Sequence, residues 1–167
     1  MDYKIKKGEH SSDRMFPFFA FSKKLVFDVK FIGSFSYRIK KQKDTNKLIG
    51  LSDSWHHHRN SVRVGWRWNS VAGNVELMAI IYNNGYRTIK HLKFLPSSKR
   101  VLISIEIQDN HYSIKINNEE FLFERTSRWK FIRYGLFPYF GGDTVAPKDF
   151  RFSIKKIKKI VASVKNN

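Results

Sequence analysis

Hydrophobic and polar residues alternate along much of this chain with a period of two. The clearest stretch is 101–107, where four aliphatic residues at odd positions are separated by Leu102, Ser104 and Glu106. Successive side chains of a β-strand point to opposite faces, so this pattern is typical of a strand with one buried face. The chain then turns at 109–110, returns with the same period and turns again at 117–118. The segment therefore predicts three consecutive antiparallel strands.

Turn signals recur over the whole chain at roughly the 8–12-residue spacing of an all-β sandwich. The triplet Asn83-Asn84-Gly85 is a hairpin signal, because Asn and Gly tolerate positive φ. Further alternating segments lie at 34–39, 61–68 and 149–157. We predict about eleven short strands and no helix, arranged as an antiparallel two-sheet β-sandwich.

The 167 residues fit one domain with its own hydrophobic core. We predict a flexible basic lead-in over residues 1–14, a single β-sandwich domain over 15–160 and a tail over 161–167. The apolar run 15–21 contains Pro17 and is too short for a signal peptide or a membrane-spanning helix. A cytoplasmic or particle-associated location is therefore favoured.

The net charge of the chain is the property that indicates a class of partner. The chain has 32 Lys and Arg residues against 14 Asp and Glu, which gives a net charge of +18. Such a balance points to an anionic partner: an acidic polysaccharide is our first expectation, and nucleic acid the second. Lysines spread singly over a solvated surface are the plainer explanation. The chain has no cysteine, which excludes disulfides, thiolate metal sites and a cysteine nucleophile.

The candidate chemistry concentrates in residues 52–68, SDSWHHHRNSVRVGWRW. We interpret 52–60 as a loop and 61–68 as a strand. In that strand the valines and tryptophans would face the core, while Arg63, Gly65 and Arg67 would lie on an exposed face. Gly65 is expected to let another group approach that face closely. Guanidinium groups there would suit a carboxylate, sulfate or phosphate.

Two later segments, VLISIEIQDNHYSIKINNEEFLF and LFPYFGGDTVAPKDFRFSI, resemble strands of the concanavalin A-like lectin, glucanase and polysaccharide-lyase group. The resemblance implies a sandwich of jelly-roll type in which one sheet is concave and sugars lie across it. It also implies that Arg63 and Arg67 project into that groove. Function is not carried by such a fold alone.

The chain departs from the enzymes of that group. It lacks the paired acidic motif of the retaining glucanases, which argues against hydrolysis by two carboxylates. Alginate-type lyases of the group use Arg, Gln or Asn, His and Tyr on neighbouring strands. This chain has those residue types in Arg63, Asn60, His57 and Tyr139, although not in the group's recognisable strings.

Three consecutive histidines raise the question of a metal. Asp53 precedes His56 by three residues, so a surface zinc site is conceivable. A metal usually needs three or four ligands at fixed spacing with supporting hydrogen bonds. We therefore predict no metal and no cofactor, and interpret the histidines as loop residues that bond the backbone or contact a ligand.

Our first hypothesis is a carbohydrate-binding module that recognises an acidic glycan through a basic, aromatic-rimmed sheet face, without catalysis. The predicted ligand-binding residues are Trp55, His57, His58, Asn60, Arg63, Arg67 and Tyr139. Two alternatives stay open. One is a polysaccharide lyase in which His57 or Tyr139 is the base and Arg63 neutralises a uronate. The other is a structural component of a phage or virion.

Overall fold

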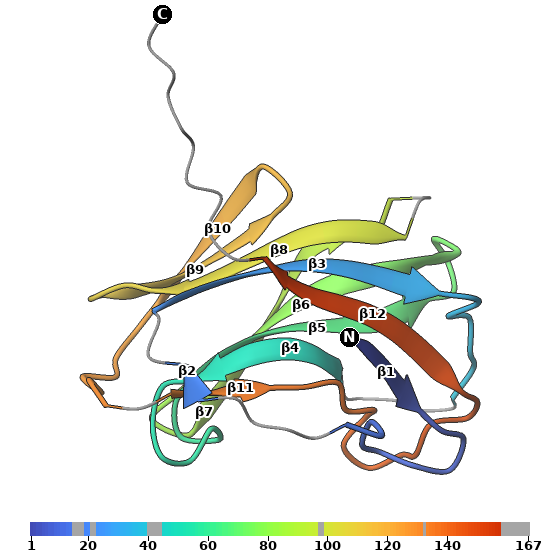
Figure 1. Cartoon of the computed structure of the whole chain (residues 1–167), viewed down its shortest axis with the longest axis horizontal. Helices are drawn as coiled ribbons and strands as arrows, with labels where there is room; N and C mark the ends of the chain where they lie inside the picture. Colours follow the sequence, from blue (N-terminus) through green and yellow to red (C-terminus); the bar gives the residue numbers. More distant parts are fainter. Residues whose placement is uncertain (15–18, 21–22, 40–44, 97–98, 132, 158–167) are drawn as a thin grey trace, which may run out of the picture.

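The computed structural model describes residues 1–14, 19–20, 23–39, 45–96, 99–131 and 133–157. Within these ranges the chain forms twelve strands and no helix. The strands make two antiparallel six-stranded sheets that face each other (Figure 1). The described part of the chain thus has no helix that could cross a membrane. The all-β class and the two-sheet sandwich predicted from the alternating pattern are confirmed.

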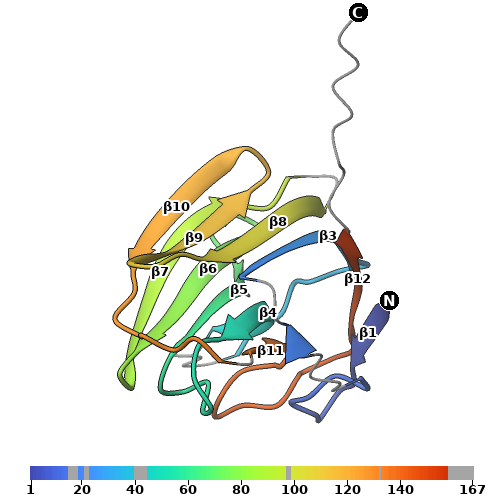
Figure 2. The same ribbon diagram turned by 60° about the vertical axis from the view of Figure 1, so that its left-hand side comes forward.

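The first sheet has the strand order β1-β12-β3-β8-β9-β10. Its members are β1 (Asp2–Ile5), β12 (Phe150–Ile157), β3 (Lys24–Ile32), β8 (Arg100–Ile107), β9 (His111–Ile116) and β10 (Glu119–Glu124). The second sheet has the order β2-β11-β4-β5-β6-β7. Its members are β2 (Phe19–Ala20), β11 (Arg133–Leu136), β4 (Asn46–Ser52), β5 (Ser61–Asn69), β6 (Asn74–Asn83) and β7 (Tyr86–Phe94). Figure 2 shows the second sheet passing beneath the first.

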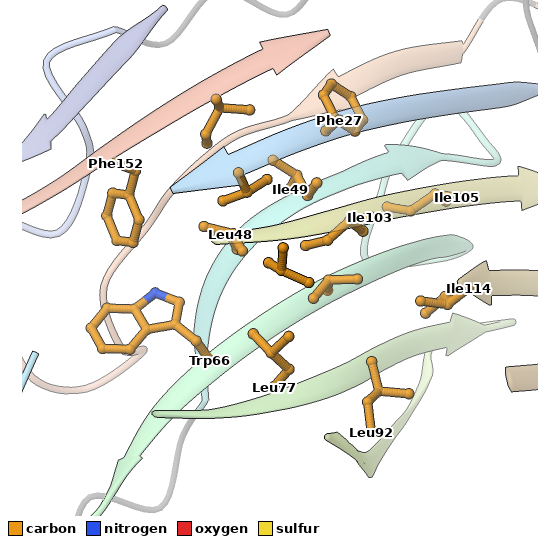
Figure 3. Close-up of a cluster of buried hydrophobic side chains, with 14 of the residues drawn as sticks. Phe27, Leu48, Ile49, Trp66, Leu77, Leu92, Ile103, Ile105, Ile114 and Phe152 are labelled. Carbon is orange, nitrogen blue, oxygen red and sulfur yellow. The ribbon is translucent and has the colours of Figure 1, made fainter. Parts of the chain in front are cut away.

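The core lies between the sheets, where side chains from both layers meet (Figure 3). Trp66 of β5 is fully buried, and its ring packs edge-on against Phe35 and Phe150 at centroid distances of 5.2 and 5.0 Å. Val62 and Val64 are also fully buried, as the alternation in β5 predicted. Burying aromatic and aliphatic surface of this kind is the main driving force for closing the two sheets.

The amino-terminal segment differs from the prediction. Residues 2–5 form β1, which pairs with β12, and Tyr3 and Ile5 are buried. A flexible lead-in over residues 1–14 is therefore wrong for this stretch, because its apolar residues alternate with the lysines and fill the edge of the core. The predicted tail, 161–167, lies outside the described residues.

Candidate functional site

The outer face of the second sheet carries the polar side chains of β5. Residues paired in antiparallel register point to the same side of a sheet. Arg63 pairs with Gly50 of β4 and Ile80 of β6. Ser61 pairs in the same way with Ser52 and Tyr82. We call the side that bears Ser61, Arg63, Gly65 and Arg67 the arginine face.

Arg63 is buried in this face, which the sequence did not predict. Its exposed fraction is 7%. Its Nε and the Oγ of Ser61 are buried atoms that find no hydrogen-bond partner among the described residues. Burial lowers the pKa of the Arg63 guanidinium to about 10, although Tyr82 and Tyr134 act in the opposite direction. The face thus holds a buried cation with no carboxylate beside it in the described part of the chain.

Two glycines explain how this face is packed. A Cβ on Gly50 would lie 2.5 Å from Cγ of Arg63, so the absence of a side chain there lets the arginine cross β4. A Cβ on Gly65 would lie 2.6 Å from the carbonyl oxygen of Asn46 and 2.9 Å from Cγ2 of Thr45. The groups that approach Gly65 are therefore the backbone of Asn46 and the side chain of Thr45 in the chain itself.

The histidine loop, residues 53–60, meets the arginine face at Tyr134 of β11. The Tyr134 hydroxyl donates to the carbonyl of Trp55 at 3.2 Å and accepts from the backbone N–H of His57 at 3.2 Å. It also lies 3.0 Å from Nδ1 of His57. Because its single proton goes to Trp55, we assign the hydrogen to His57 Nδ1, which leaves Nε2 as an acceptor.

The surroundings of His57 keep its ring neutral. Burial lowers its pKa to about 4, and the charge of Arg63 acts in the same direction. His58 is exposed and lies 5.3 Å from the ring of Tyr82. Partial burial and the charges of Arg63, Lys47 and Arg87 lower its pKa as well. Near neutral pH the two histidines therefore offer uncharged nitrogen atoms.

A buried ion cluster fixes the base of the histidine loop. Asp53 is fully buried and accepts hydrogen bonds from Arg125, Arg133 and the hydroxyl of Tyr112 at 2.6–3.1 Å. Burial, followed by the charge of Asp53, raises the pKa of Tyr112, so this hydroxyl stays protonated. Since all its bonds point inward, Asp53 is not placed to share a metal with His56. The described residues contain no group of three metal ligands.

The other predicted residues fall in three different places. Asn60 is buried, and its Oδ1 accepts the backbone N–H of Asn84, so it ties the histidine loop to the β6–β7 turn. Arg67 does lie on the arginine face, where its Nε donates to Glu76 at 2.6 Å. Tyr139 lies at the rim, with its ring 5.7 Å from Nζ of Lys47 and stacked on His10.

Glu76 lies on the arginine face beside Arg67, with which it forms an ion pair. Its second oxygen lies 2.6 Å from Nδ1 of His91. Burial alone would raise the pKa of Glu76, but the hydrogen bonds from Arg67 and His91 outweigh burial and lower it. This carboxylate is therefore ionised near neutral pH, and its charge is matched by Arg67.

Trp55 does not lie on the arginine face. It is 71% exposed and lines a cavity with Trp129 and Phe131. Sequence reasoning also missed Tyr82 and Tyr134. Both act to raise the pKa of Arg63, and the hydroxyl of Tyr134 lies 3.0 Å from Nδ1 of His57. Both are ordinary tyrosines in alternating strands, so only their pairing with β5 and their contact with the loop distinguish them.

Comparison with known proteins identifies the fold of this chain. No protein-family model and no curated protein matches the chain. Among solved structures, alginate lyase AlyC3 matches with a TM-score of 0.61 and 13% identity, covering 94% of this chain and 75% of that one. This chain has the concanavalin A-like jelly-roll fold.

Two further structures share this jelly-roll fold. A functionally unknown protein from Saccharomyces cerevisiae matches with a TM-score of 0.58 and 9% identity, covering 95% of this chain and 89% of that one. The catalytic domain of a laminarinase, an endo-1,3-beta-glucanase from Thermotoga petrophila RKU-1, matches with a TM-score of 0.57 and 13% identity, covering 93% and 74%. The fold that the two carboxy-terminal segments implied is confirmed, and identities this low concern the fold alone.

Proposed function

We propose that this protein binds an acidic polysaccharide across the arginine face. The observation that carries the proposal is the buried guanidinium of Arg63, whose Nε has no partner among the described residues. A buried charge without a counterion costs free energy. An anion of a ligand that pairs with this guanidinium would remove that cost and stabilise the complex. A uronate carboxylate is such an anion.

The charges and rings of the face support this ligand class. Lys47, Arg67 and Arg87 occupy the same face as Arg63, and the carboxylate that the described strands contribute is Glu76, already paired with Arg67. Aromatic rings of Tyr82, Tyr134 and Tyr139 supply surfaces that suit sugar rings. Among the structural neighbours, AlyC3 has been solved in complex with dimannuronate, and that match has a TM-score of 0.58.

Substituting Arg63 tests this proposal. Arg63→Met keeps a long apolar side chain and removes the guanidinium. Titration calorimetry with oligomannuronates should show affinity at least about tenfold below that of the unsubstituted protein. Arg151→Met is the matched control, because Arg151 is exposed on β12 in the other sheet and should change affinity less than about twofold. Equal effects of the two substitutions would contradict the proposal.

The pairing of His57 with Tyr134 favours a second candidate function, β-elimination on a uronate polymer. Nε2 of neutral His57 would remove the C5 proton while Arg63 holds the carboxylate. The C4–O4 bond then breaks, a C4=C5 double bond forms, and the departing oxygen takes a proton from an acid such as Tyr134. The sequence offered His57 or Tyr139 as the base, and the tyrosine whose hydroxyl lies 3.0 Å from Nδ1 of His57 is Tyr134.

Ultraviolet absorbance separates binding from elimination, because the unsaturated uronate product absorbs and the substrate does not. An enzyme would produce this absorbance from polymannuronate, and His57→Ala would abolish it while leaving most of the affinity. Binding without any absorbance change would leave the protein as a binding module.

A further inference from the structure

Exposed aromatic side chains gather at the end of the sandwich that carries the histidine loop. Trp55 and Phe131 are each 71% exposed, and the ring of Trp129 lies 4.9 Å from that of Phe131. These three rings line a cavity of about 460 Å³ together with Arg59 and Arg128. A cluster of large aromatic side chains exposed to solvent is typical of a surface that binds a partner.

The surface continues around the loop that follows β10. A neighbouring cavity of about 530 Å³ shares Arg128 and Trp129 with the first and adds Lys23 and Lys130. Its acidic residue, Asp109, already pairs with Lys23. We call the lining of the two cavities the loop-end surface. It combines aromatic rings with an excess of positive charge, which suits a chain of anionic sugars.

The buried cluster of Asp53, Arg125 and Arg133 anchors both loops that form the loop-end surface. Asp53 lies two residues before Trp55, and its carboxylate binds Arg125 and Arg133. Those two arginines also donate to the carbonyl of Trp129, at 3.1 and 2.8 Å. The loops 53–60 and 125–131 lie together at one end of the molecule (Figure 1). These bonds fix the backbone of both loops before any ligand arrives, which lowers the entropic cost of binding.

The loop-end surface is separate from the arginine face yet adjoins it. None of the residues that line its two cavities is Arg63, Tyr82 or Tyr134. The two regions meet at the histidine loop, where the hydroxyl of Tyr134 bonds the carbonyl of Trp55. A polymer long enough to pass the loop could contact both.

We propose that the loop-end surface is a second binding site for the acidic polysaccharide, and that it holds a stretch of chain beyond the one at Arg63. Trp55 and Phe131 stack on sugar rings, while Arg59 and Arg128 pair with their carboxylates. For its ligand class this inference rests on the function proposed above. It predicts that affinity rises with chain length, because the second contact becomes intramolecular.

The test compares a short and a long probe, dimannuronate and polymannuronate. The double substitution Trp55→Ala and Phe131→Ala should weaken polymannuronate binding by about tenfold or more and leave dimannuronate binding unchanged. Leu122→Ala, which removes an exposed apolar side chain on β10, is the control and should change neither affinity. Thermal unfolding of each variant checks that the fold is intact.

The outcomes distinguish the two proposals. Unchanged polymannuronate affinity in the double variant, or an equal loss for both probes, would overturn the second site. Loss of polymannuronate binding in the double variant, with no effect of Arg63→Met on either probe, would overturn the arginine-face proposal and support the loop-end site. Unsubstituted protein that binds neither probe would overturn both.

Discussion

Single residues on the arginine face depart from what folding alone requires. A buried arginine ordinarily lies against a carboxylate, as Arg125 and Arg133 do with Asp53. Arg63 is buried to a similar degree, yet no carboxylate pairs with it among the described residues. The alternation along β5 predicted which face Arg63 occupies. Arg63 crosses Gly50 of β4 and lies near His57 and Tyr134, and only the fold brings these residues together, so the sequence pattern could not show its burial.

We expect Arg63→Met to raise the free energy of unfolding by about 1 kcal/mol, because it replaces an unpaired buried charge by an apolar side chain. Urea denaturation measures the change. Arg133→Met is the contrasting case: it breaks a buried pair and should lower stability by about 3 kcal/mol. A loss of stability in Arg63→Met as large as in Arg133→Met would mean that Arg63 has a structural role.

The depressed pKa of His57 predicts a pH dependence of stability. The unfolded chain binds a proton at His57 near its ordinary pKa of 6.5, whereas the folded protein binds it only near pH 4. The stability present above pH 6.5 is therefore lost progressively as the pH falls from 6.5 towards 4. In His57→Gln the loss over this interval should be smaller, as measured by urea denaturation at pH 7 and pH 4.5. Parallel losses in both proteins would contradict the assignment of a neutral, partly buried ring.

At the level of elements, local patterns predicted most strands and missed those whose pairing depends on distant residues. The Asn84-Gly85 turn has φ values of 50° and 89°, as the hairpin signal required. Phe35 is buried as its alternating segment suggested, but residues 34–39 form no strand, since this stretch joins neither ladder. In β1 the basic composition hid an apolar alternation that becomes visible once β12 is known to pair with it.

Trp66 is fully buried on the core face of β5, whereas Trp55 is exposed on a loop. Trp66→Ala should lower the free energy of unfolding by about 3–5 kcal/mol, because it leaves a cavity among Phe35, Phe150 and other rings. Trp55→Ala removes the same side chain from an exposed loop and should lower it by less than about 0.5 kcal/mol. Chemical denaturation of both variants checks this, and similar losses would contradict the burial of Trp66 in the core and the exposure of Trp55 on its loop.

At the scale of the whole molecule, the net charge of +18 acts on every polyanion. A general excess of charge gives unselective attraction that falls steeply with salt, because it rests on the release of counterions. A preorganised binding site adds contacts with sugar rings and hydrogen bonds from buried donors. Salt weakens these interactions much less. Composition predicted only the first effect. The second depends on the arginine face and the loop-end surface, which the fold assembles from separate strands and loops.

The most direct test of an acidic-glycan site is a glycan array run beside a nucleic-acid titration, each at low and at high salt. We predict selective binding to one class of acidic glycan that persists at high salt and is lost in Arg63→Met. Equal binding to all polyanions, abolished by salt and indifferent to Arg63→Met, would contradict it. The charge would then act by itself, and a structural role in a phage or other virion would become the better hypothesis.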